Sequence, residues 1–404
     1  MRPKQLQLLQ GTDGLAPEGG EDGSSRLAAI SAAFDPGRLT QARRLAGWTK
    51  RSVSEVVGAS PAAVGQRESG AAAPRPDHVG RLADLLEVPP GFFAIGRRQV
   101  RLDAADAHFR SLRSTPAGLR AKAIAFTEQI SELVHALETR IQLPPVEIPG
   151  FAGGEVHPGD YAGDPAAAAT ELRQRWRLGD APIPRIVRTM ERNGIVVTLV
   201  PFAGAATKTV DAFSTSHLPR PIVVLTPDRA DDIYRHRFTA AHELGHLMLH
   251  EETAPGDAVH EREADAFAAE FLTPRDSVVS PLPTRVDLHE LERLGQAWGV
   301  SVESLVYRCH EVGTISDATY RRAFQRLNQL RKLNLFAPEP VGNYPGEVPT
   351  LICKAFAVAE KHGLTMAKLA NELQITLPRL QLLLGHAATH SAARVGIRPC
   401  EEGS

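Results

Sequence analysis

Two histidines and a glutamate stand at a spacing that suits metal chemistry. They are His242, Glu243 and His246, in the segment FTAAHELGHLMLH. Four residues of an α-helix turn through about 400°, so the two histidines would lie one turn apart on the same face. Two neutral imidazoles in that position can bind one Zn²⁺. Glu243 would stand beside the open position of the metal, where its carboxylate could take a proton from a metal-bound water. The H-E-x-x-H motif therefore predicts a zinc-dependent hydrolase with Glu243 as the general base.

A catalytic zinc site of this type needs a third protein ligand, and a helical run downstream carries two candidates. We expect Glu263 to be the ligand, because it follows His246 by 17 residues, enough for a loop and a returning helix. Glu261 is the alternative; two residues are about 200° apart around a helix, so both carboxylates cannot face the metal. Asp265 could orient a metal-binding imidazole by accepting a hydrogen bond from its other ring nitrogen, or it could be a solvated carboxylate. His250, one turn after His246, is expected not to be a ligand.

The segments RFTAAHELGHLMLH and EREADAFAAEFLTP resemble the ImmA/IrrE family of zinc metallopeptidases, over about residues 165–280. The resemblance implies zinc as the cofactor, and it implies these site residues: zinc ligands His242, His246 and Glu263, and general base Glu243. Asp265 stands where the family more often has Asn. The resemblance also implies a compact mixed α/β peptidase core, and intracellular, regulatory proteolysis of helix-turn-helix repressors.

Upstream, residues 38–95 show the short helices and turns of a compact all-α module. Gly58 offers a turn between two short helices, and Ser60 followed by Pro61 is typical of a helix start. The stretch resembles a Cro/CI-type (XRE-type) helix-turn-helix domain. In that geometry the second helix of the pair enters the major groove, and the start of the first contacts phosphates. The resemblance thus assigns contacts with double-stranded DNA to Lys50, Arg51, Ser60, Ala62, Ala63, Gln66 and Arg67.

Charge is distributed unevenly along the chain. The net charge is −1, from 46 basic and 47 acidic residues. This balance excludes a protein that coats nucleic acid through basic residues along its whole length. From Arg38 to Arg75, however, seven basic and two acidic residues give a local charge of +5, which can neutralise phosphates. Lys50 stands where the family usually has Gln, and the helix expected in the major groove is rich in short side chains. DNA binding with little sequence specificity is therefore an alternative. A helix-turn-helix that binds only protein is another.

The pattern as a whole predicts a multidomain protein that is mainly α. We expect an N-terminal all-α helix-turn-helix domain and a mixed α+β zincin-like core with strands near 195–200, 210–214 and 222–225. The expected parts are a disordered tail (1–34), the helix-turn-helix domain (35–96), a helical linker (97–150), the metallopeptidase domain (151–280), a helical extension (281–335) and a C-terminal helix-turn-helix-like segment (336–404). The last part is suggested by a weak repeat.

The repeat aligns residues 49–69 with residues 365–385 without gaps. Apolar residues coincide at 53 and 369, 57 and 373, and 64 and 380. The second copy carries Leu382, Leu383 and Leu384, which are packing residues rather than groups that contact base edges. We therefore expect it to be a packing or dimerisation element.

Together these features predict a bacterial-type transcriptional regulator that binds DNA as a homodimer and cleaves a repressor-type protein with its zinc peptidase core. A non-proteolytic, ligand-sensing transcription factor and a phage or toxin–antitoxin repressor are the alternatives. The longest apolar run, about residues 194–206, is too short for a bilayer, which needs about 20 residues. The N-terminus has no apolar signal core, so we expect a cytoplasmic protein without membrane partners.

Overall fold

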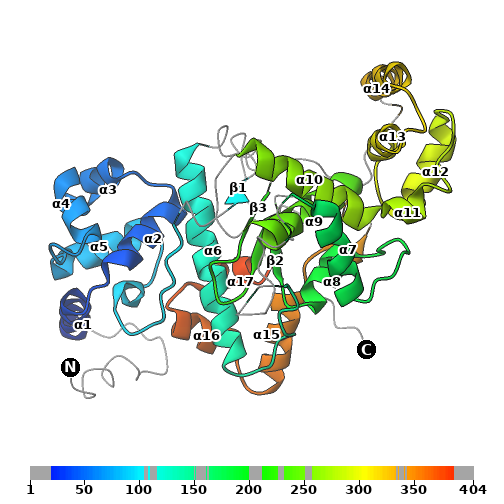
Figure 1. The fold of residues 1–404 in the computed structure, drawn as a ribbon. Helices are drawn as coiled ribbons and strands as arrows, with labels where there is room; N and C mark the ends of the chain where they lie inside the picture. The colour runs from blue at the N-terminus through cyan, green and yellow to red at the C-terminus, as the bar shows by residue number, and fades with distance from the viewer. Residues whose placement is uncertain are drawn as a thin grey trace. The chain divides into compact units, whose positions relative to one another are not determined.

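The computed structural model describes residues 20–103, 108–109, 116–149, 151, 161, 163–199, 212–225, 232–250, 257–333, 335, 341 and 344–385 (Figure 1). The chain divides into two compact units. The first comprises residues 1–101, 117–136 and 363–380; the second comprises residues 102–116, 137–362 and 381–404. Over the described residues, no helix has both the length and the apolar character needed to cross a membrane.

The described residues 20–101 of the first unit form helices joined by turns. The helices are α1 (Gly20–Ala32), α2 (Pro36–Ala46), α3 (Lys50–Val57), α4 (Pro61–Glu68), α5 (Pro76–Leu86) and the 3₁₀ helix η3 (Pro90–Phe93). Asp35, Thr49 and Ser60 cap α2, α3 and α4, because each side chain accepts a hydrogen bond from a backbone N–H of the first turn. Gly58, with φ at 72°, ends α3 in the left-handed conformation and turns the chain toward α4. The predicted all-α helix-turn-helix domain is confirmed.

Helix α1 lies where the sequence analysis expected the last part of a disordered tail. Gly20–Ala32 are helical, and Ile30 is fully buried where α1 contacts α5 and η3. Ser31 donates its hydroxyl to the Pro74 carbonyl at 2.5 Å. Leu27 and Ile30 are three residues apart and share a helix face, so the end of this polar stretch carries enough apolar surface to pack.

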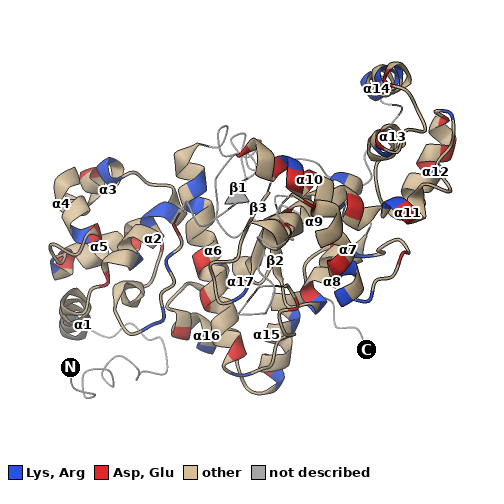
Figure 2. Ribbon diagram, viewed as in Figure 1, with Lys and Arg blue, Asp and Glu red and all other residues tan. Residues whose placement is uncertain are grey.

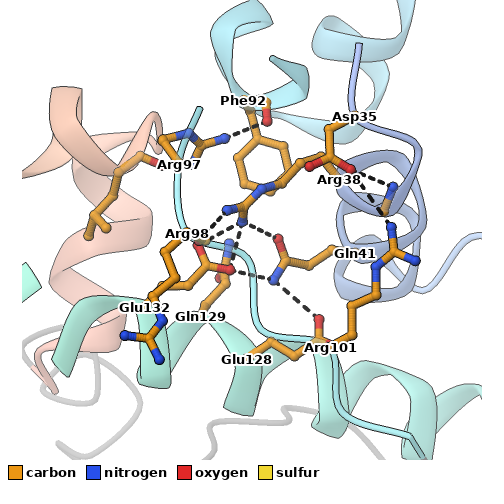
Figure 3. Close-up of polar contacts among 12 residues, drawn as sticks. Asp35, Arg38, Gln41, Phe92, Arg97, Arg98, Arg101, Glu128, Gln129 and Glu132 are labelled. Carbon is orange, nitrogen blue, oxygen red and sulfur yellow. Dashed lines mark hydrogen bonds and ion pairs between the residues drawn. The ribbon is translucent and has the colours of Figure 1, made fainter. Parts of the chain in front are cut away.

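A buried polar network joins α2 to α6 (Ala117–Glu138) within the first unit (Figure 3). Arg38 of α2, which is fully buried, donates to both carboxylate oxygens of Glu132 at 2.6 Å. Gln41 donates to Glu132 at 3.0 Å and to Glu128 at 3.2 Å. The Arg38 guanidinium also lies 5.5 Å from the ring centroid of Phe92. Hydrogen bonds between charged groups therefore hold α6 against the helix-turn-helix domain.

Two C-terminal helices, α16 (Met366–Leu373) and α17 (Leu377–Leu383), repeat the build of α3 and α4. Thr365 caps α16 through the backbone N–H three residues later, as Thr49 caps α3. Gln374, with φ at 50°, ends α16 in the left-handed conformation that Gly58 adopts after α3. The buried positions also coincide: Leu369, Ala370 and Leu373 correspond to Val53, Ser54 and Val57. The segments that align in sequence thus share capping and burial.

The second unit contains a four-stranded sheet in the order β1-β3-β4-β2. The strands are β1 (His108–Phe109), β2 (Val196–Leu199), β3 (Ala212–Thr215) and β4 (Ile222–Leu225). β2 is parallel to β4, whereas β3 is antiparallel to β4 and to β1, with His108 opposite Ser214. The three predicted strand runs are present. β1 was not predicted, because two residues carry no periodic pattern.

The second unit also contains the helices α7 (Pro165–Arg175), α8 (Ile186–Arg192), α9 (Ile233–Leu249), α10 (Ala258–Leu272) and α11 (Arg275–Val278). α9 contacts β3 and β4, and it also contacts α7, α8 and α10 (Figure 1). Fourteen of the 17 residues of α9 are buried, so its polar side chains must find partners inside the protein. The mixed α+β core is therefore confirmed.

The chain continues through α12 (Leu288–Trp298), α13 (Val302–Glu311), α14 (Asp317–Lys332), η10 (Pro345–Glu347) and α15 (Leu351–Lys361). Glu347 connects η10 to the core, because its carboxylate accepts hydrogen bonds from the backbone N–H groups of Ile186 and Val187 at 3.1 Å each. It also forms a buried ion pair with Arg237 of α9. This ion pair fixes the N-terminal half of the helix that carries the H-E-x-x-H motif.

Candidate metal centre and nucleic-acid interface

The H-E-x-x-H motif lies in the middle of α9, the most enclosed helix of the core. His242 and Glu243 have no exposed surface, and His246 is 2% exposed. Helical spacing brings the two imidazoles to the same side, with ring centroids 4.7 Å apart. Two imidazoles and a carboxylate at this depth need hydrogen bonds or a cation to offset lost solvation.

Three side chains, His242, His246 and Glu261, bring together atoms that could bind a metal ion. The Nε2 atoms of His242 and His246 are 3.1 Å apart. The carboxylate oxygens of Glu261, in α10, lie 3.4 Å from His242 Nε2 and 3.8 Å from His246 Nε2. Tetrahedral Zn²⁺ with bonds of about 2.0–2.1 Å would place neighbouring ligand atoms about 3.3–3.4 Å apart. This nitrogen, nitrogen and oxygen set therefore fits zinc.

Glu263, which the sequence analysis expected to be the third ligand, contacts a different side chain. Its Oε2 lies 3.1 Å from His250 Nε2. His250 Nδ1 in turn lies 3.0 Å from His246 Nδ1. Burial lowers the pKa of His250, which favours its neutral imidazole at neutral pH. The structure thus brings Glu261 to the two Nε2 atoms and Glu263 to His250.

The phase of α10 explains this arrangement. Glu261 and Asp265 are four residues apart and share one face of α10, and Asp265 Oδ1 lies 2.8 Å from His242 Nδ1. The two helices approach closely at Gly245, where an added Cβ would lie 3.2 Å from the backbone of Ala264. Which residues of α10 reach the histidines depends on how the two helices pack. Residue spacing in the sequence does not contain that information.

Glu243 has a partner that the sequence analysis did not name. Ser214, in β3, donates its hydroxyl to Glu243 Oε2 at 2.7 Å, and both residues are fully buried. The bond ties the carboxylate to an inner strand of the sheet. In the sequence, Ser214 stands at the end of a predicted strand. Serine is common at such positions, so the sequence does not indicate a contact with Glu243.

The expected DNA contacts lie on α3, on α4 and at Ser60, the N-cap of α4. Five of the seven are exposed: Lys50, Arg51, Ser60, Ala62 and Gln66. Ala63 is partly exposed. Figure 2 shows basic residues on α3. Lys50 Nζ lies 3.3 Å from the carboxylate of Glu68, and Arg51 pairs with Glu55 at 3.1 Å. Both basic side chains therefore have an acidic neighbour with which DNA phosphates would compete.

The expectation that Arg67 points outward is wrong. Arg67 follows Val64 by three residues and shares its inward face, so it is only 7% exposed. Its Nη2 lies 2.5 Å from His78 Nδ1 in α5, and burial lowers the pKa of its guanidinium. Arg38 is also buried. The local charge of +5 therefore overstates the positive charge that this domain can present to DNA.

Comparison with known families agrees with both parts of this description. Residues 39–93 match the family model described as helix-turn-helix, and residues 190–310 match a peptidase family model described as the IrrE N-terminal-like domain. The second match includes all of α9 and α10. No curated protein shows a match to the chain. The chain therefore combines a helix-turn-helix domain of the XRE type with an IrrE N-terminal-like peptidase domain.

Proposed function

We propose that this protein is a DNA-binding transcriptional regulator whose core is a zinc-dependent peptidase that cleaves a helix-turn-helix repressor. The observation that carries the proposal is the cluster of His242, His246 and Glu261, with the buried carboxylate of Glu243 next to it in sequence. The helix-turn-helix match supports DNA binding, and the IrrE-like match supports peptidase chemistry.

His242, His246 and Glu261 would hold the ion. We propose Glu261 in place of Glu263 because its oxygens are the ones near the two Nε2 atoms. Three protein ligands leave one coordination position open, as catalytic zinc sites require. When bound there, Zn²⁺ supplies Lewis-acid polarisation of a peptide carbonyl and makes water more acidic.

Glu243 would act as the general base, accepting a proton from the attacking water and passing it to the leaving amine. Ser214 would help to position this carboxylate, because its hydroxyl donates to Glu243 Oε2 at 2.7 Å. The same hydrogen bond limits rotation of the Glu243 side chain and keeps it beside the metal ligands.

The helix-turn-helix domain would supply the regulatory output. Gln66, exposed on α4, can pair with adenine in the major groove, and Lys50 and Arg51 can contact phosphates. We propose that the protein acts as a homodimer, because domains of this kind usually bind two half-sites. Arg67 is left out of the base-contacting set because it is buried.

Metal analysis of four proteins tests the centre. Wild type should contain one zinc ion per chain, His242→Ala should lose it, and Glu243→Gln should keep it. His289→Ala, which removes an exposed histidine of α12, is the matched control and should retain the metal. A wild-type protein that binds no zinc would remove the peptidase from the proposal and leave a DNA-binding sensor.

Turnover is tested with helix-turn-helix repressors as substrates. Wild type should cleave at least one of them, whereas Glu243→Gln should bind zinc and cleave none. Cleavage that persists in Glu243→Gln would refute the assigned general base. A promoter that Glu243→Gln regulates as wild type does would favour a sensor without proteolysis.

A further inference from the structure

We propose that His250 and Glu263 form a positioning relay that holds His246 in the orientation needed to bind the metal. The inference rests on the proposed function, because it concerns the surroundings of the same metal centre. It gives Glu263 a role that differs from that of a ligand, and it gives His250, which was not expected to be a ligand, a role in holding one.

The relay consists of two consecutive contacts, which lead from His246 of α9 through its C-cap residue His250 to Glu263 of α10. His246 Nδ1 lies 3.0 Å from His250 Nδ1, and His250 Nε2 lies 3.1 Å from Glu263 Oε2. Both ring nitrogens of His250 therefore contact side-chain atoms other than the Nε2 atoms of His242 and His246. His250 could not ligate the same ion without giving up both contacts.

The chemistry of imidazole sets the direction of each hydrogen bond. His246 Nε2 faces the other two ligand side chains, so its lone pair must remain available there and its proton belongs on Nδ1. His246 Nδ1–H then donates to His250 Nδ1. His250 must carry its own proton on Nε2, and that N–H donates to the Glu263 carboxylate. This one distribution of protons satisfies all three groups.

The two histidine ligands are supported in different ways. Asp265 accepts directly from His242 Nδ1 at 2.8 Å, but its side chain is 48% exposed. The side chains of His250 and Glu263 are 3% and 21% exposed. Because hydrogen bonds strengthen where water is excluded, we expect the relay to contribute more to metal affinity than Asp265 does.

His260 provides a control within the same cluster. Its ring stacks on that of His250, with centroids 4.1 Å apart and an interplanar angle of 25°. This contact helps to hold the plane of the His250 ring. A phenylalanine at 260 would keep the stacking and would leave the relay intact.

The test uses the full-length chain and measures metal binding rather than turnover. His250→Phe removes the acceptor for His246 and keeps an aromatic ring. We expect its Zn²⁺ dissociation constant, from competition with a chelator, to rise about 10- to 100-fold. The visible absorption bands of bound Co²⁺ should shift as well. His250→Asn places an amide oxygen near the lost Nδ1 and should restore part of the affinity, and His260→Phe should match wild type.

Two glutamine variants separate a relay from a ligand. Glu261→Gln should lose more affinity than Glu263→Gln, because only Glu261 would contact the ion. Glu263→Gln keeps an oxygen that can accept from His250 but loses the charge, so its effect should be smaller than that of His250→Phe. Zinc loss in Glu263→Gln together with retention in Glu261→Gln would overturn the relay.

The outcomes distinguish this inference from the proposed function. A wild-type chain that binds no zinc would refute the zinc centre itself. A wild-type chain that binds zinc, with His250→Phe and His250→Asn equal to it in affinity and Co²⁺ spectrum, would refute the relay alone. Circular dichroism of each variant checks folding, and His250→Asn keeps the test decisive if His250→Phe does not fold.

Discussion

Removing the carboxylate of Glu132 should destabilise the helix-turn-helix domain by about 3–5 kcal/mol, the usual cost of leaving a buried charge without its partner. Arg38 has no exposed surface and donates to both oxygens of that carboxylate at 2.6 Å. Gln41 also loses an acceptor at 3.0 Å. In Glu132→Ala, Arg38 would keep the carbonyl of Arg98 at 2.8 Å, which favours the lower half of the range.

Native-state hydrogen exchange of the α2 amides, followed by mass spectrometry, measures this cost locally. A single global free energy of unfolding is not well defined for a chain with two units. Glu55→Ala is the control, because it removes an exposed pair with Arg51 and should cost less than about 0.5 kcal/mol. The double variant Arg38→Met/Glu132→Leu should regain most of the loss. If the α2 amides exchange no faster in Glu132→Ala than in Glu55→Ala, the buried pair does not stabilise the domain and the reasoning is refuted.

Three further substitutions test the core, the base and the interface. Gly245→Ala would place a Cβ 3.2 Å from the Ala264 backbone, so urea unfolding of the second unit should show a loss of about 1–3 kcal/mol. Unchanged stability would mean that α9 and α10 can move apart to accommodate the added methyl group without a loss of free energy. Ser214→Ala removes the 2.7 Å hydrogen bond to Glu243, so turnover should fall about 10- to 150-fold while zinc content stays at the wild-type level. Loss of zinc would show a structural role instead. Gln66→Ala should weaken operator binding by about 1–3 kcal/mol in fluorescence anisotropy and leave non-specific binding unchanged. An equal loss on both DNAs would contradict base contact.

The elements that the sequence predicts well are those whose residues carry local signals. Capping residues and Gly58 mark the ends of α3 and α4, and apolar runs mark β2 and β4. β1 and the contact between α2 and α6 carry no such signal. Glu132 is 94 residues from Arg38, and a charged helix residue far along the chain is ordinarily solvated.

The candidate metal centre divides in the same way. His242, Glu243 and His246 follow from helical spacing alone, because all three lie on one helix. The choice between Glu261 and Glu263 depends instead on how α10 is rotated against α9. That rotation is a matter of tertiary packing, so two residues with the same chemistry could not be ranked from the sequence. The sequence was equally insufficient on α4. Gln66 is exposed whereas the next residue, Arg67, is buried.

The repetition of α3 and α4 by α16 and α17 bears on the stoichiometry of DNA binding. Leu382 occupies the position that corresponds to Gln66. Arg379, the basic residue of α17, donates to Gln129 of α6 at 2.7 Å, and its guanidinium lies 5.4 Å from the ring centroid of Phe126. The second copy thus directs its cation toward a neighbouring helix, so under the proposed function one chain would offer one base-contacting helix. Titration of a duplex with two half-sites should therefore saturate at two chains, although each chain contains two helix pairs of the same build.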